Sequence, residues 1–220
     1  MRTINKLILI LFLTNVFSLS ACTSKIEENG NGKSVTFQNS QDLDTAYFAS
    51  GCFWCVEAVF ESVIGVEEAV SGYSGGSEKN PTYRQVSAGM TSHAEAVMVI
   101  YNSKKQDFKT LVKVFFGSHD PTTLNRQGPD RGSQYRSIAF YSNENERKII
   151  KDFIVKLENS NSYSQPIVTE VQPFKVFWKA EDYHQNYERR NPNDSYVRNV
   201  SIPRLNRFKE KFPELLKENN

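Results

Sequence analysis

The order of apolar patterns between residues 45 and 216 limits this chain to one kind of fold. Short apolar runs typical of strands are mixed with amphipathic segments at helical spacing, without a strict strand–helix–strand repeat. The expected strands are 45–50, 66–73, 94–101, 134–141 and 167–171. The expected helices are 52–63, 108–118, 144–158 and 180–190, with a terminal helix after Pro203. This order predicts an α+β domain, with a mixed sheet and helices packed on it as a two-layer sandwich and an irregular C-terminal region.

The size and charge of the chain narrow the class of protein. Its 220 residues, 39% hydrophobic and 24% charged, are enough for one domain with its own core. The chain has 27 basic and 25 acidic residues, and removal of Arg2 and Lys6 with a signal peptide leaves 25 of each. This balance gives no electrostatic preference for nucleic acid. We expect a monomer.

The N-terminus carries an export signal. Arg2 and Lys6 precede an apolar run, and no charged residue occurs from Leu7 to Ser24. The end of this run, LSAC at 19–22, resembles a bacterial lipobox, in which the cysteine is lipidated and becomes the new N-terminus. We therefore expect a lipoprotein signal peptide at 1–21, lipid on Cys22, a flexible polar tether at 22–44 and a folded domain at 45–216.

This assignment places the protein outside the cytoplasm. We expect it to be exported and held by a lipid anchor in the bacterial cell envelope, on the periplasmic or cell-surface side. Two alternatives stay open: an ordinary N-terminal membrane anchor, and a cleaved signal peptide with an incidental cysteine.

Two cysteines remain once Cys22 is assigned to lipid. Cys52 and Cys55 make no disulfide framework, and a bridge across so short a loop adds little stability by chain entropy. A zinc site needs further ligands, and the three histidines, His93, His119 and His184, do not occur at ligand spacing. We expect no metal and no other cofactor.

The position of Cys52 favours thiol chemistry. Gly51 breaks the strand 45–50, and Cys52 opens the helix 52–63, where unpaired N–H groups and the helix dipole stabilise a thiolate. Cys55 lies three residues later on nearly the same helix face, within reach of an oxidised Cys52. The pair indicates a thiol redox enzyme without naming its substrate. A CxxC motif after a strand is also typical of thioredoxin-like proteins.

Glu95 is the only charged residue in the apolar run AEAVMVI at 94–100. Its same-face neighbours, Val97 and Val99, predict that the carboxyl is buried, although a solvent-facing position is the ordinary alternative. Burial raises the pKa of a carboxyl, so that it stays protonated near neutral pH and can donate a proton. Asp120 and Asp130 lie in the expected loop 119–133, where aspartate is common in turns.

Several segments together resemble peptide methionine sulfoxide reductase of the A type. They occur in the family's order and span about residues 46–192. The matching segments are GCFWCVEAVF at 51–60, SGYSGG at 71–76, NPTY at 80–83, HAEAV at 93–97, HDPTTLNRQGPDRGSQYRS at 119–137 and DYHQNY at 182–187.

The resemblance implies a reaction and a site. The enzyme would reduce the S epimer of methionine sulfoxide in proteins or peptides. Cys52 would attack the sulfoxide sulfur and become a sulfenic acid, while Glu95 protonates the oxygen. Tyrosines would bind that oxygen and aromatic side chains would enclose the S-methyl group. The implied substrate-binding residues are Phe53, Trp54, Tyr83, Asp130, Tyr135 and Tyr187.

The chain departs from the family pattern at its recycling cysteine. Many members have a cysteine after a tyrosine in the C-terminal tail, where this chain has Val197, and no cysteine follows Cys55. Many relatives have glycine at the position of Cys55, and a subset of the family has cysteine there. We therefore predict a Cys52–Cys55 disulfide, reduced by a thioredoxin-like partner. The alternative is a single-cysteine cycle in which an external thiol reduces the sulfenic acid.

Two other functions stay open. One is a general thiol–disulfide oxidoreductase that uses the CxxC motif alone. The other is a non-catalytic lipoprotein that binds methionine-rich or oxidised peptides.

Overall fold

A computed structural model describes residues 26–28, 35–37 and 42–218. Cys22 and most of the expected tether lie outside these residues. Within the tether region, β1 (Ile26–Glu28) and β2 (Val35–Phe37) pair in an antiparallel ladder. The main domain begins with β3 at Leu43, close to the expected start.

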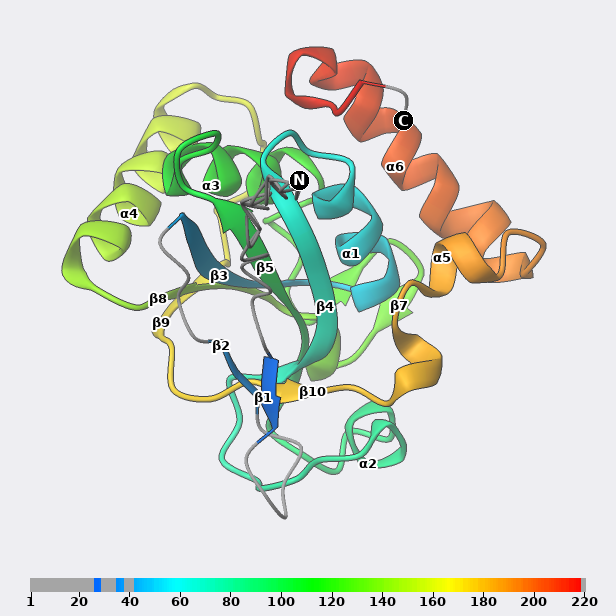
Figure 1. The fold of residues 1–220 in the computed structure, drawn as a ribbon. Helices are drawn as coiled ribbons and strands as arrows, with labels where there is room; N and C mark the ends of the chain where they lie inside the picture. The colour runs from blue at the N-terminus through cyan, green and yellow to red at the C-terminus, as the bar shows by residue number, and fades with distance from the viewer. Residues whose placement is uncertain (1–25, 29–34, 38–41, 219–220) are drawn as a thin grey trace, which may run out of the picture.

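A six-stranded sheet forms the centre of the domain, in the order β10–β4–β5–β3–β8–β9 (Figure 1). Neighbouring strands are antiparallel except for β8 and β9, which are parallel, so the sheet is mixed as predicted. The bounds of the strands are β3 Leu43–Ser50, β4 Val66–Ser74, β5 Ala94–Asn102, β8 Ser137–Tyr141, β9 Glu170–Pro173 and β10 Trp178–Lys179.

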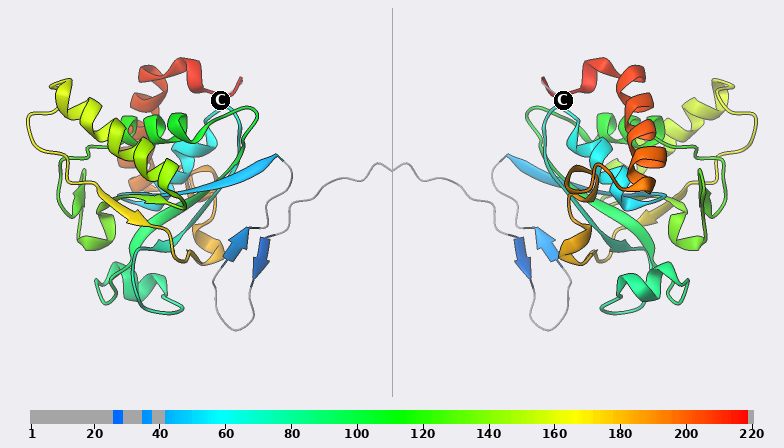
Figure 2. Two further views of the ribbon diagram at one scale, coloured as in Figure 1. Left: turned by 90° about the vertical axis from the view of Figure 1, so that its left-hand side faces the viewer. Right: turned by 90° about the vertical axis from the view of Figure 1, so that its right-hand side faces the viewer.

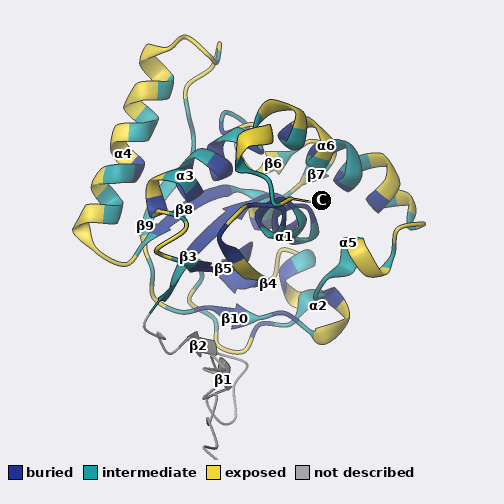
Figure 3. Cartoon of the chain, turned by 45° about the horizontal axis from the view of Figure 1, so that its top comes forward, coloured by how far each residue is buried: buried dark blue, intermediate teal, exposed yellow. Residues whose placement is uncertain are grey.

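Helices pack on one face of this sheet (Figure 2). They are α1 (Phe53–Glu61), α3 (Phe108–Gly117), α4 (Glu144–Asn159) and α6 (Ile202–Lys211). Phe48 and Val97 of the sheet belong to the same buried cluster as Phe115 and Phe208 of the helices. The central strands are buried, while α4 and α6 expose their outer sides (Figure 3). The predicted two-layer α+β fold is confirmed.

A smaller cluster covers the opposite face of the sheet. Tyr47, Met98 and Ile138 alternate along their strands with the helix-facing residues and pack against the segment before β10. There the ring of Phe174 stacks on that of Tyr47, with centroids 3.6 Å apart. Both faces of β3 and β5 are therefore buried, which explains their nearly continuous apolar sequences.

Four segments differ from the expected structure in their bounds or content. The strand expected at 134–141 begins at Ser137, because Ser133–Tyr135 forms a 3₁₀ turn, and the strand expected at 167–171 lies at Glu170–Pro173. The NPTY segment at 80–83 leads into the short helix α2 (Tyr83–Ser87), which Thr82 caps. The expected loop 119–133 contains a small hairpin, formed by β6 (Arg126–Gln127) and β7 (Asp130–Arg131).

The helix predicted over 180–190 is wrong. Asp182–His184 is a 3₁₀ turn, and α5 covers only Tyr187–Arg190. Asn186 has a left-handed backbone, with φ at 54°, which interrupts any continuous helix. The side chain of Gln185 pairs with both backbone groups of Ser71, so contacts with β4 override the local helical pattern.

The C-terminal region is more helical than expected. A π-helical turn at Val197–Ser201 leads into α6, and Pro203 lies in the first turn of that helix, where its missing N–H is tolerated. A final 3₁₀ turn at Pro213–Leu215 follows. Among the described residues, no helix combines the length and apolar character needed to cross a bilayer.

Candidate active site

A strand–turn–helix junction positions the two cysteines. β3 ends at Ser50, Gly51 turns the chain with φ at +90°, and Cys52 is the N-cap residue of α1. A Cβ atom on Gly51 would lie 2.6 Å from the Cβ of Gln127, so glycine is required both by its backbone conformation and by the close approach of the 119–133 loop. Cys52 and Cys55 are both free and buried, with 7% and 2% of their surfaces exposed.

Glu95 lies against the first turn of α1. Its side chain is 1% exposed, and its Oε2 accepts a hydrogen bond from the Phe53 N–H at 3.0 Å. Burial raises the pKa of this carboxyl to about 8, and the Asp130 carboxyl adds to the shift, although the Phe53 N–H opposes it. The predicted burial of Glu95 is confirmed, and the direction of its pKa shift agrees with the prediction.

The two thiols differ in acidity in a direction that the helix position alone did not predict. Burial raises the pKa of Cys52, and the neighbouring Cys55 and Glu95 add to the effect. A hydrogen bond from Cys52 lowers the pKa of Cys55 to about 6, with the Arg204 guanidinium assisting.

Cys52 and Glu95 share one cavity, of about 280 Å³, which we call the Cys52 cavity. The predicted residues that line it are Phe53, Trp54, Tyr83, Asp130 and Tyr135, and the remaining lining residues are Asp194, Ser195 and Tyr196. The cavity thus brings a sulfur nucleophile and a protonated acid together beside aromatic side chains. Tyr187 does not line it, and instead stacks on Trp54 from behind, with ring centroids 3.7 Å apart.

Comparisons with known proteins agree with this geometry. The family model of peptide methionine sulfoxide reductase matches residues 44–216. The chain belongs to the peptide methionine sulfoxide reductase family. It is 50% identical over 174 residues to the peptide methionine sulfoxide reductase MsrA 1 of Rhodopirellula baltica, covering 79% of this chain and 90% of that protein.

Two further relatives extend the comparison. The MsrA of Natronomonas pharaonis is 48% identical over 170 residues, which cover 77% of this chain and 96% of that protein. The solved structure of methionine sulfoxide reductase A of Corynebacterium diphtheriae superposes with a TM-score of 0.63 at 34% identity, over 71% of this chain and 78% of that chain.

Two residues of the site were missed by the sequence analysis. The Tyr196 hydroxyl donates a hydrogen bond to Asp130 Oδ2 at 2.6 Å and lies 3.9 Å from the Cys55 sulfur. The buried His184 accepts a hydrogen bond from the Trp54 indole N–H at 3.2 Å and fixes that ring. His184 lies in the DYHQNY segment that resembles the family, and Tyr196 is the C-terminal tyrosine that precedes Val197, so a signal existed for both residues.

The other two histidines have structural roles. His119 donates from Nδ1 to the carbonyl of Phe115 at 2.7 Å and contacts the Ser137 hydroxyl at 2.8 Å. His93 is buried and bonds to the backbone of Gly76 and Glu78. Among the residues that the structure describes, no group of three His, Cys, Asp or Glu side chains is arranged to hold a metal ion.

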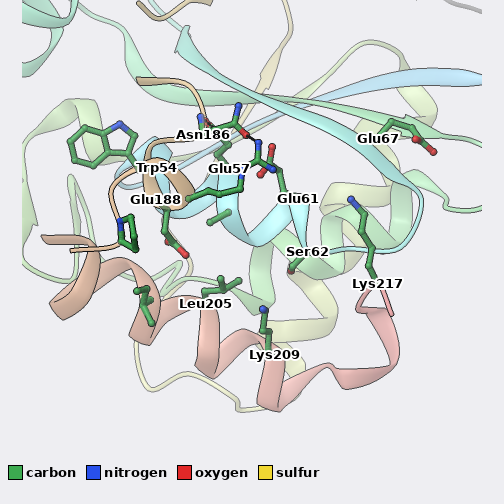
Figure 4. A pocket seen from close by; sticks show the side chains of 14 residues that line it. Trp54, Glu57, Glu61, Ser62, Glu67, Asn186, Glu188, Leu205, Lys209 and Lys217 are labelled. Carbon is green, nitrogen blue, oxygen red and sulfur yellow. Dashed lines mark hydrogen bonds between the residues drawn. The ribbon is translucent and has the colours of Figure 1, made fainter. Parts of the chain in front are cut away.

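Glu57 anchors the first helix from its other side. Its carboxyl is 2% exposed and accepts hydrogen bonds from the Ser71 hydroxyl and the Asn186 N–H, beside a cavity of about 430 Å³ between α1 and α6 (Figure 4). Burial raises the pKa of Glu57 to about 7. One side chain therefore ties α1 to β4 and to the segment that carries His184 and Tyr187.

Replacing Glu57 with alanine should destabilise the fold around the site. The Ser71 hydroxyl and the Asn186 N–H lose their acceptor in a buried position, so we expect the free energy of unfolding to fall by about 2–3 kcal/mol. Glu57→Gln keeps an acceptor oxygen and should lose about half as much or less. Urea unfolding of the variants measures this, and equal stability of Glu57→Ala and the parent chain contradicts the anchoring role.

Proposed function

We propose that this chain is an oxidoreductase that reduces the S epimer of methionine sulfoxide in proteins or peptides to methionine. The observation that carries the proposal is the shared cavity of Cys52 and Glu95, in a chain of this family. A sulfoxide presents a polarised oxygen beside a methyl group. The Cys52 cavity supplies an acid and tyrosine hydroxyls for the oxygen and aromatic surface for the methyl.

In the first step, the Cys52 sulfur attacks the sulfoxide sulfur. Glu95 transfers its proton to the sulfoxide oxygen, which makes the sulfur more electrophilic. Burial raises the pKa of Tyr83 to about 12 and also raises that of Tyr135, so both hydroxyls keep their protons and act as donors. The oxygen passes to Cys52 as a sulfenic acid, and methionine leaves as the thioether.

In the second step, Cys55 resolves the sulfenic acid. Its thiolate attacks the Cys52 sulfur, the sulfenic oxygen takes up the proton that the Cys52 thiol released in the first step and leaves as water, and a Cys52–Cys55 disulfide forms. Support comes from the position of Cys55 one helical turn after Cys52 and from its pKa of about 6, which keeps it ionised near neutral pH. A thioredoxin-like dithiol then reduces the disulfide.

Mass spectrometry after one turnover tests the resolving step. With one equivalent of methionine sulfoxide peptide and no reductant, we expect a Cys52–Cys55 disulfide and a mass decrease equal to two hydrogen atoms. Cys55→Ser should instead accumulate the sulfenic acid, which a cyclic β-diketone can trap because its carbon nucleophile attacks the electrophilic sulfenic sulfur. A lasting sulfenic acid on Cys52 in the parent chain would show a single-cysteine cycle.

Two activity assays separate this function from its rivals. With dithiothreitol as reductant, the chain should turn over an S-sulfoxide peptide and leave the R epimer unchanged. A general thiol–disulfide oxidoreductase would reduce insulin disulfides and ignore the sulfoxide. A non-catalytic binding protein would do neither.

We further propose that the protein is lipid-anchored in the cell envelope. The support is the sequence around Cys22, which follows an apolar run with small residues before the cysteine. Metabolic labelling with a fatty-acid analogue should label the parent chain and move it to the membrane fraction, whereas Cys22→Ser should lose the label. An unlabelled parent chain in the membrane fraction would indicate an ordinary N-terminal anchor.

A further inference from the structure

The two cysteines open into different cavities. Cys52 lines the Cys52 cavity, and Cys55 lines another of about 370 Å³, which we call the Cys55 cavity. Neither cysteine is among the lining residues of the other cavity. Among the described residues, the cavities share only Asp130 and Tyr196, whose side chains are hydrogen-bonded to each other at 2.6 Å. The Asp130–Tyr196 pair therefore lies at the boundary between the two cavities, while the two sulfur atoms are in hydrogen-bond contact with each other.

The Cys55 cavity is lined by positive charge. Arg204 is 7% exposed and is held by the backbone carbonyls of Ser118 and Ser50, at 2.8 and 3.0 Å, and by the Ser50 hydroxyl. Among the described residues it forms no ion pair with a carboxylate within 4.0 Å. Arg207, one turn further along α6, lines the same cavity and is exposed.

Asp130 is the one acidic residue among those that line the Cys55 cavity. Its Oδ2 accepts the Tyr196 hydroxyl, and its pKa is raised by burial. When Cys55 is uncharged in the Cys52–Cys55 disulfide, two guanidinium groups against one carboxyl leave the cavity with a net positive charge. An anionic group entering from solvent is therefore attracted towards Cys55, and the Cys52 cavity offers no such cation.

We propose that the Cys55 cavity is a separate entrance through which a thiol that carries a negatively charged group reaches the sulfur of Cys55 and reduces the Cys52–Cys55 disulfide. This inference rests on the disulfide cycle of the proposed function. It assigns reduction to a different opening from the one used by the sulfoxide, so the two half-reactions do not compete for one pocket.

The exchange balances in two steps. A reductant thiolate attacks the Cys55 sulfur, forms a mixed disulfide with it, and releases Cys52 as a thiolate into the Cys52 cavity, where it takes up a proton. A second reductant thiolate then attacks the reductant sulfur of the mixed disulfide and releases Cys55 as a thiolate. The nearby Arg204 guanidinium stabilises that leaving group. Two thiols are oxidised to one disulfide, and both cysteines are reduced.

Alkylation of Cys55 in a Cys52→Ser chain tests the entrance without any turnover. Mass spectrometry of the peptide that contains Cys55 gives its alkylation rate with iodoacetate, which is an anion, and with iodoacetamide, which is neutral. Each rate in the folded chain is divided by the rate of the same reagent with the urea-unfolded chain. We expect the normalised iodoacetate-to-iodoacetamide ratio to exceed one and to fall roughly threefold in Arg207→Gln, as for a partly exposed charge. Lys211→Gln, which removes an exposed cation of α6 outside the cavity, should leave the ratio unchanged.

A saturating methionine sulfoxide peptide supplies the second arm. In the Cys52→Ser chain it occupies the Cys52 cavity without reaction, and Cys55 should be alkylated as fast as in its absence. Protection of Cys55 by the peptide, or an iodoacetate ratio that Arg207→Gln does not change, overturns the proposal.

The oxidised parent chain provides a check that does not depend on Cys52→Ser folding. Mercaptoethanesulfonate should reduce its disulfide faster, per thiolate, than cationic cysteamine, and Arg207→Gln should remove most of that preference. Equal rates with both thiols contradict the entrance. Formation of methionine in a single turnover is measured separately, so loss of the proposed function remains distinguishable from loss of this entrance.

Discussion

Cys52→Ser should lower the rate of methionine formation by at least about 10⁴-fold, which is the scale expected when a covalent nucleophile is removed. An alcohol is a much weaker nucleophile than a thiolate, and transfer of the sulfoxide oxygen to serine would require a hydroperoxide in place of a sulfenic acid. The substitution thus removes both the nucleophile and the redox centre. Chromatographic measurement of methionine formed from a sulfoxide peptide, with dithiothreitol present, checks this result.

Cys55→Ser is the matched control, since it makes the same chemical change three residues away on the same helix. It should still form one methionine per chain in a single turnover, because Cys55 and the reductant act only after methionine has been released. This result should be the same with dithiothreitol and without any reductant. Because the lowered pKa of Cys55 also makes that thiol a candidate nucleophile, the comparison of the two variants tests which cysteine attacks the sulfoxide. Activity in Cys52→Ser with none in Cys55→Ser would transfer the role of nucleophile to Cys55.

Glu95→Gln should lower the rate of the sulfoxide half-reaction by roughly 10²–10⁴-fold, the usual contribution of a general acid. Glutamine can accept the Phe53 N–H and still offer a hydrogen bond, but it has no proton to transfer to the leaving oxygen. Single-turnover kinetics isolate this step from recycling. Glu57 is a second buried carboxyl, on the far side of α1, so Glu57→Gln serves as the control and should keep most of the activity. Equal losses of activity in Glu95→Gln and Glu57→Gln would indicate a structural effect alone.

The pKa of Glu95 gives this assignment a pH signature. In a Cys52→Ser background no chemistry follows binding, so affinity for the sulfoxide peptide reports the carboxyl directly. Below pH 8 the neutral acid donates to the sulfoxide oxygen, and above pH 8 the carboxylate repels it. Calorimetry should therefore show binding weakening by roughly tenfold as the pH rises through about 8. Adding Glu95→Gln should make the affinity independent of pH in this range.

Several features of the site were predictable from local sequence. Glu95 could be placed inside because Val97 and Val99 share its strand face, and side-chain alternation along a strand depends on the backbone alone. Cys52 could be placed at the start of a helix because Gly51 breaks the strand and the apolar spacing then changes. Both patterns depend on neighbouring residues, so contacts with distant segments of the chain do not change them.

Other features depended on contacts between distant segments. The helix expected over 180–190 is interrupted at Asn186. The side chain of Gln185 bonds to the backbone of Ser71 and the Asn186 N–H bonds to the Glu57 carboxyl, and both partners are more than 100 residues away in the chain. Tyr187 lies behind Trp54 instead of in the cavity for the same reason. The spacing of apolar residues within 180–190 cannot indicate that a side chain of this segment bonds to another element of the fold.

The sequence by itself determined the α+β fold, the junction that holds Cys52 and the buried acid opposite it, since strand and helix periods and turn residues are properties of neighbouring positions. Only the tertiary structure decided which thiol is the more acidic and which opening each cysteine faces. The pKa of Cys55 is lowered first by its hydrogen bond with Cys52 and then by Arg204, and Tyr196 lines both cavities. Arg204 and Tyr196 approach the cysteines from the C-terminal region, and electrostatic shifts and cavities arise from distances in space that spacing along a chain does not contain.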